Sequence, residues 1–72
     1  MKYYILEIQG YTNGTFAYLI DSADTFNSAE SIFYDKCHYA AVSTLPVHTV
    51  IMLDSDGATY MSKTWRREVA SE

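Results

Sequence analysis

The sequence predicts a small α+β fold in which four antiparallel strands, in the sheet order 2-1-3-4, carry one helix on one face. Residues 27–42 form the one convincing helical segment, and a pair of strand-like segments joined by a turn signal lies on each side of it. The turn signals are Asn13-Gly14 before the helix and Asp54-Ser55-Asp56-Gly57 after it. The order ββαββ follows, because each turn pairs its strands as a hairpin and the helix returns the chain across the sheet. The 72 residues suffice for one domain, predicted over 1–68, with 69–72 as a frayed tail.

The first predicted hairpin pairs residues 2–9 with residues 15–22, both rich in β-formers. A two-residue type I′ loop at Asn13-Gly14 would place Ile8 opposite Leu19. One face would then consist of Tyr4, Leu6, Ile8, Ala17 and Leu19, and the other of Tyr3, Ile5, Glu7, Gln9, Tyr11, Phe16, Tyr18 and Ile20. We expect the first face to lie against the helix, because Glu7 and Gln9 belong on a solvated surface. An error of one residue in register would invert this assignment.

The predicted helix begins at Asn27, which has Glu30 three positions later in the spacing of a capping box. It should end near Ser43 or Thr44, because Pro46 cannot continue it. Its sheet-facing stripe consists of Ala29, Phe33, Cys37 and Ala40, with Ile32 at the edge and Lys36 at the margin, the Lys36 ammonium group lying in water. The opposite face is poor in charge and carries Tyr34, His38, Ala41 and Val42. It is either an ordinary solvated face or a contact face for a partner.

The second predicted hairpin pairs residues 47–53 with residues 58–65 through a type I turn that Gly57 closes in the left-handed region. Ile51 would lie opposite Met61, and Leu53 opposite Thr59. The buried side of this hairpin is predicted to be Val47, Ile51, Leu53, Met61 and Trp65. The turn is too short for a calcium loop and lacks its late glutamate, so we expect a plain hairpin turn there.

Composition and charge narrow the functional classes. Nine acidic and five basic residues give a net charge of −4, which disfavours general nucleic-acid binding. A single cysteine, no signal peptide and no apolar run of membrane-spanning length together predict a cytoplasmic protein. Cys37 and His38 diverge by about 100° on a helix, and with His48 they do not have the spacing of a zinc site. We therefore expect no enzyme activity, metal or cofactor, with Cys37 in the core and His38 at the surface.

The sequence favours a protein–protein interaction module that forms a homodimer and binds a further protein. Aromatic side chains that one helix cannot cover support this hypothesis. The expected interface residues are Tyr3, Ile5, Tyr11, Phe16 and Tyr18, with Tyr34 and His38 on the outer helix face as a second set. The alternative is a nucleic-acid-binding accessory protein, in which Trp65 stacks on bases while Lys63, Arg66 and Arg67 contact phosphates.

Overall fold

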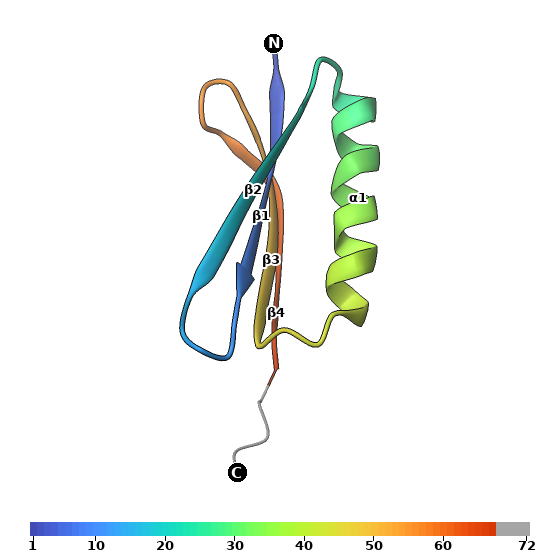
Figure 1. The fold of residues 1–72 in the computed structure, drawn as a ribbon. Coiled ribbons are helices and arrows are strands. Elements are labelled where there is room, and N and C mark those ends of the chain that lie inside the picture. Colours follow the sequence, from blue (N-terminus) through green and yellow to red (C-terminus); the bar gives the residue numbers. More distant parts are fainter. Residues whose placement is uncertain (68–72) are drawn as a thin grey trace.

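A computed structural model describes residues 1–67 and shows an α+β fold with the predicted topology (Figure 1). The elements are β1 (Tyr3–Gly10), β2 (Phe16–Ala23), α1 (Phe26–Val42), β3 (Val47–Asp54) and β4 (Thr59–Arg66). All strand pairs are antiparallel and the sheet order is β2-β1-β3-β4, as predicted. The helix covers one face of the sheet, and no other element of residues 1–67 covers the opposite face. The predicted tail at 69–72 lies outside the described residues.

The two hairpin loops have the same conformation, and this corrects the register predicted for the first hairpin. The amide of Gly14 donates to the carbonyl of Tyr11 (3.0 Å), and the amide of Tyr11 donates to the carbonyl of Thr15 (2.9 Å). Gly14 has a φ of 89°, whereas Asn13 does not adopt positive φ. The loop is therefore a three-residue turn with a left-handed glycine, not a two-residue type I′ turn. Ile8 consequently lies opposite Tyr18 rather than Leu19.

The second loop follows the prediction. The amide of Gly57 donates to the carbonyl of Asp54 (2.9 Å), and Gly57 has a φ of 90°. The carboxylate of Asp54 accepts from the amides of two loop residues and from the hydroxyl of Tyr60 (2.8 Å). A register shift next to Leu53 preserves its predicted pairing with Thr59 but places Ile51 opposite Ser62 instead of Met61.

The helix begins one residue earlier than predicted and has a different cap. Thr25 is the N-cap, and its hydroxyl accepts from the amide of Ser28 (3.2 Å). Asn27 therefore lies inside the first turn, and the predicted capping box with Glu30 is wrong. The sheet-facing stripe is confirmed: Ala29, Phe33 and Ala40 are buried, and Ile32 and Cys37 pack against them.

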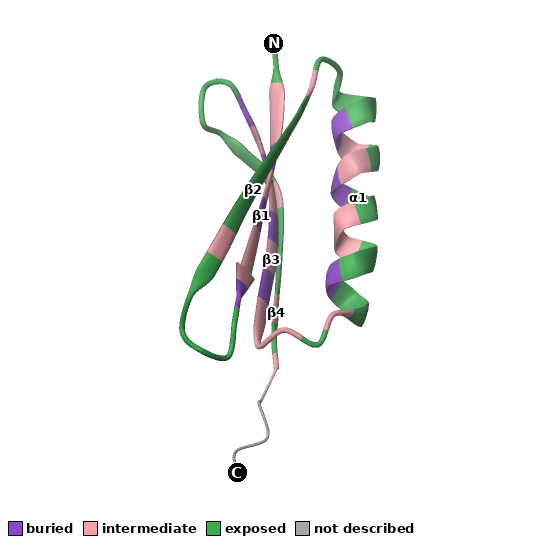
Figure 2. Cartoon of the chain, in the orientation of Figure 1, coloured by how far each residue is buried: buried purple, intermediate pink, exposed green. Residues whose placement is uncertain are grey.

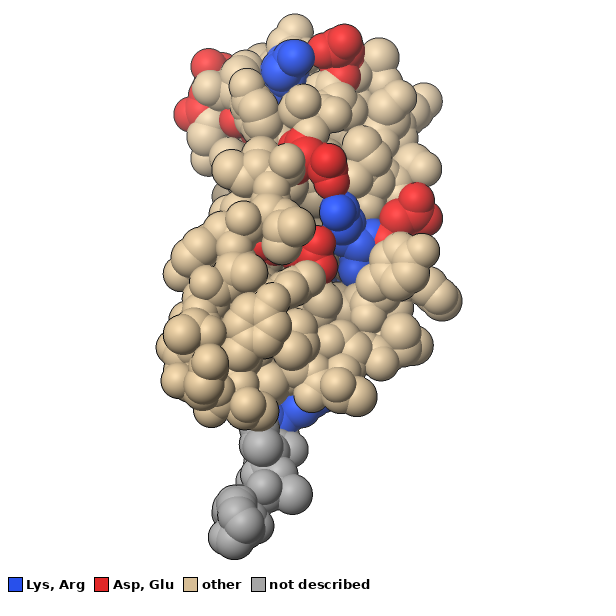
Figure 3. Space-filling model, viewed as in Figure 1, with Lys and Arg blue, Asp and Glu red and all other residues tan. Residues whose placement is uncertain are grey.

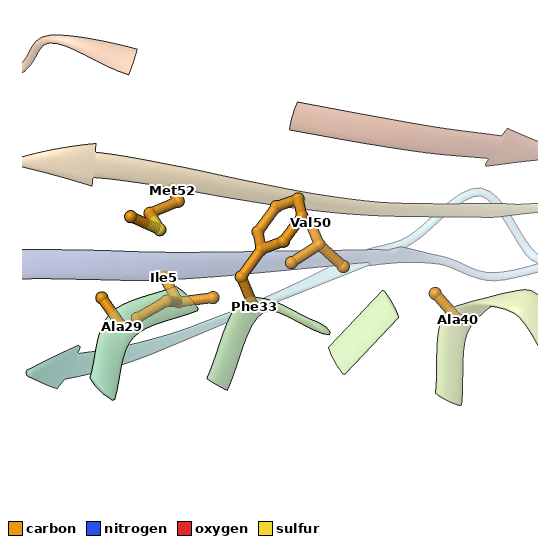
Figure 4. Packing of buried hydrophobic residues seen from close by; sticks show 6 residues of the cluster. All are labelled: Ile5, Ala29, Phe33, Ala40, Val50 and Met52. Carbon is orange, nitrogen blue, oxygen red and sulfur yellow. The ribbon is translucent and has the colours of Figure 1, made fainter. Parts of the chain in front are cut away.

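The strand residues that face the helix are as predicted on β2 and β4, namely Ala17, Leu19, Met61 and Trp65, but not on β1 and β3. The hydrophobic core consists of Ile5, Ala29, Phe33, Ala40, Val50 and Met52 (Figure 4), with Met61 and Trp65 packed against it. Glu7, His48 and Asp54 are also buried on this side. In Figure 2 the buried parts of α1 lie on its side toward the sheet. The assignment of β1 to the helix through Tyr4, Leu6 and Ile8 is wrong, as is that of β3 through Val47, Ile51 and Leu53. Both strands present the opposite alternation, because the polar residues of the inner face find partners inside the protein.

The uncovered side of the sheet is called the open face below. Its apolar residues are Tyr4, Leu6 and Ile8 from β1, Phe16, Tyr18 and Ile20 from β2, and Val47, Ile51 and Leu53 from β3. The short polar residues Thr49, Ser62 and Thr64 complete it on β3 and β4. The open face thus carries six large aliphatic side chains, whereas the buried core contains three, Ile5, Val50 and Met52, with Ile32 and Met61 packed against them.

Candidate interaction surface

The open face is a continuous apolar surface across three neighbouring strands. On the edge strand β2, the exposed fractions are 51% for Phe16, 65% for Tyr18 and 68% for Ile20. The apolar residues of β1 and β3 are half-buried, because adjacent side chains on the same face shield one another. Exposed apolar residues are ordinary when they are scattered, whereas a contiguous patch is typical of an interaction site.

Phe16 lies across the end of β1 and extends the open face toward β3. A Cβ atom at Gly10 would meet the Phe16 ring at 2.8 Å and the Cβ of Val47 at 3.0 Å. Gly10 therefore provides the space in which the Phe16 ring lies over the backbone. The Phe16 and Tyr18 rings stack with centroids 6.5 Å apart, so one end of the open face is largely aromatic.

The open face is also nearly free of charge. Within the four strands, Arg66 is the one charged residue on it, and the Lys2–Asp24 ion pair (3.5 Å) lies just beyond the strand ends. In the view of Figure 3, charged side chains gather in the upper half and along the boundary between sheet and helix. The acids of the strands, Glu7, Asp21 and Asp54, all lie on the helix side.

A polar network accounts for the charge on the helix side. The Glu7 carboxylate accepts from His48 Nε2 (2.5 Å) and from the Gln9 amide (3.0 Å), and it lies 3.4 Å from Lys36 Nζ. Lys36 Nζ also lies 2.9 Å from Asp21, so its ammonium group joins two acids of the sheet rather than reaching into water as predicted. Burial acts to raise the pKa of Glu7, but the hydrogen bonds from Gln9 and His48 and the charge of Lys36 hold that pKa below its ordinary value.

The predicted interface residues do not share one surface, and two of the seven, Phe16 and Tyr18, lie on the open face. The placement of Tyr3 and Ile5 on the open face is wrong, because Ile5 is fully buried in the core and Tyr3 packs against Phe26 and Tyr60 at ring distances of 5.8 and 5.9 Å. Tyr11 is exposed beside the first loop, but its hydroxyl donates to Gln9 on the helix side of the sheet, so its predicted place beside Phe16 and Tyr18 is wrong. His38 is exposed on the helix, whereas Tyr34, although 56% exposed, donates its hydroxyl to the sulfur of Met61 on β4 (3.9 Å) and so lies at the margin between helix and sheet.

The residues that sequence reasoning missed are the aliphatic ones of the open face: Leu6, Ile8, Ile20, Val47, Ile51 and Leu53. Five of them had been assigned to the helix-facing sides of β1 and β3, and Ile20 was placed on the outer face of the first hairpin without being named as an interface residue. No local sequence signal identifies them, because the burial of Glu7 depends on Lys36 and His48, which are distant from it in sequence.

The basic cluster near the C-terminus is dispersed. Lys63 and Trp65 lie on the helix side, with Lys63 Nζ 5.8 Å from the centre of the Trp65 ring, and Trp65 packs against the core. Arg66 lies on the open face. Arg67 Nη2 donates to the carbonyls of Ala40 and Ala41 (2.7 and 2.9 Å) and so caps the C-terminal end of the helix. The four residues therefore do not share one surface for a nucleic acid.

The candidate reactive side chains are separated. Cys37 is half-buried against the core, as predicted, and burial raises the pKa of its thiol. His38 is exposed, also as predicted, and His48 is buried beside Glu7. Among residues 1–67 there is neither a cavity nor a group of three potential metal-ligating side chains.

Comparison with known proteins assigns no relative. No family model matches the chain, and no curated protein or solved structure matches it. In the part of the chain that the structure describes, the helix lacks the length and apolar character needed to cross a membrane.

Proposed function

We propose that this protein is a non-enzymatic interaction module that binds protein through the open face of its sheet. The observation that carries the proposal is a contiguous apolar face, crossed by three strands, that the chain's one described helix leaves uncovered. A protein partner suits this face, because apolar side chains supply most of the binding free energy when a second apolar surface excludes water from them. The aromatic end at Phe16 and Tyr18 offers the type of side chain that is enriched at such contacts.

The proposal is tested by photo-crosslinking from two matched positions in cells that express the protein. A photoreactive benzoylphenylalanine replaces either Tyr18 on the open face or Tyr39 on the exposed surface of the helix, since the two tyrosines are 65% and 67% exposed. We expect adducts with protein from position 18 and far fewer from position 39. Equal yields at the two positions, or no adduct from position 18, would contradict the proposal.

A further inference from the structure

We infer that the occupant of the open face is a second copy of this chain, packed face to face so that the two sheets form a sandwich. This inference rests on the proposed function, because it names the partner of the same surface. It commits to contact through the face and not along the free edge of β2.

Apolar residues are abundant on both sides of the sheet, although the helix covers one side alone. The buried core contains four side chains larger than alanine, namely Ile5, Phe33, Val50 and Met52, and partly buried residues such as Ile32, Met61 and Trp65 pack against it. The open face holds six large aliphatic residues in addition to its aromatic rings. A chain of 72 residues buries only about 60% of its unfolded surface. Covering the open face would add a second core, and another copy is the one partner present whenever the chain folds.

The distribution of charge also favours a second copy on the open face. Two copies with a net charge of −4 repel each other unless their acids stay apart in the complex. Glu7 and Asp21 lie on the helix side and pair with Lys36, so face-to-face contact would not bring these acids together. A neutral face can meet its own copy without repulsion, whereas a charged ligand would find few complementary charges on it.

The area of the open face and the hydrogen bonds of its polar edge are compatible with face-to-face contact. The sheet has four strands of eight residues, and strand spacings of about 4.8 Å and 3.3 Å per residue give a face of roughly 500 Å². Two such faces together reach the roughly 1,000 Å² that a specific interface requires. This value treats each face as flat, and the protruding side chains add further surface area. At the polar edge of the face, the hydroxyl of Thr49 donates to that of Thr64 (3.1 Å), so these two groups can be covered without losing their hydrogen bond.

Light scattering coupled to size exclusion tests the inference on the full chain. The wild type is expected at twice the chain mass of 8.2 kDa. Ile20→Lys and Ser62→Lys each place a charge at an exposed position of the open face, on opposite edge strands. Each is expected to raise the dimer dissociation constant at least about tenfold. Val42→Lys, at a residue 69% exposed on the helix, is expected to leave the dimer intact.

The outcomes separate this inference from the proposed function. A wild type that stays monomeric at high concentration would overturn the inference that a second copy covers the open face. Crosslinking from position 18 to other proteins would then still support the proposal of an interaction module. Dissociation by Ile20→Lys but not by Ser62→Lys would place the contact along the β2 edge and overturn the sandwich. A circular dichroism spectrum unchanged from the wild type shows that each variant folds, and both substituted side chains are exposed in the single chain.

Discussion

The face of the sheet beneath the helix contains a small core and a polar network, whereas the open face is apolar and nearly uncharged. Under the helix, alanines at positions 29 and 40 let the backbone lie close to the sheet, and Glu7 is buried among its partners. On the open face, aliphatic and aromatic side chains have no cover from the described chain. The difference teaches that a carboxylate in a strand does not by itself identify the solvent-exposed face. Glu7 can be buried because a lysine and a histidine of the same protein bind it.

Ile5 and Leu6 are adjacent in β1 but lie on opposite faces of the sheet, so substitutions at these two positions distinguish the faces most clearly. Ile5→Ala removes a fully buried side chain and should lower the free energy of unfolding by about 2–5 kcal/mol. Leu6→Ala should act mainly on association, so that its effect on the unfolding midpoint changes with protein concentration. Urea unfolding at two protein concentrations measures both effects. A larger, concentration-independent loss for Leu6→Ala would reverse the assignment of the faces.

The Glu7 network provides a second contrast with the open face. Glu7→Gln keeps the shape of the side chain but removes the charge that accepts from His48 and pairs with Lys36. We expect a loss of roughly 1.5–3 kcal/mol in urea unfolding at neutral pH. As a control, Asp35→Asn changes an exposed carboxylate of α1 and should alter the free energy of unfolding by less than about 0.5 kcal/mol. Equal effects of the two substitutions would show that the network contributes nothing specific.

The same carboxylate makes folding sensitive to acid. Because the pKa of Glu7 is lowered in the folded protein, its contribution is present above its pKa in the unfolded chain and is lost as pH falls through the lower folded pKa. Asp54, whose pKa the hydrogen bond from Tyr60 lowers, acts in the same direction. Glu7→Gln should therefore lose less stability than the wild type between neutral pH and about pH 3. Parallel stability curves for the two proteins would refute this role for Glu7.

The smallest expected effect concerns two neighbouring arginines on opposite sides of the sheet. Arg67→Gln removes the donor to the carbonyls of Ala40 and Ala41 and should cost about 1 kcal/mol in thermal or urea unfolding. Arg66→Gln, on the open face, should change monomer stability by less than about 0.5 kcal/mol. Salt-sensitive oligonucleotide binding that either substitution abolishes would instead favour the nucleic-acid alternative.

The sequence was sufficient to predict the order of elements, their approximate bounds and the sheet topology. Helical periodicity and two turn signals determine these features, and they do not depend on which side of a strand is buried. The tripeptides Thr12-Asn13-Gly14 and Ser55-Asp56-Gly57 form loops of one conformation, yet the first also matches the signal for a two-residue turn. The resulting slip of one residue altered the pairing of β1 with β2.

The choice of face required information that the sequence does not contain. The segments 3–8 and 47–54 carry apolar residues on both sides, so alternation alone does not select one. The decision therefore depended on Glu7 and Gln9, and polar residues are usually solvated. Their burial becomes favourable only when Lys36 and His48, distant in sequence, are placed beside them. The correct loop alone would not have changed the choice, because it groups the aliphatic and aromatic residues on one face.

Thiol labelling at two matched positions tests the central claim, that the open face is covered in solution, most directly. In a Cys37→Ser background, a single cysteine replaces either Ile20 or Val42, which are 68% and 69% exposed in the single chain. With rates normalised to the denatured protein, we predict that the cysteine at position 20 reacts at least about tenfold more slowly in concentrated protein and recovers on dilution. Equal and concentration-independent rates at the two positions would show that the open face stays in water, and would contradict the account.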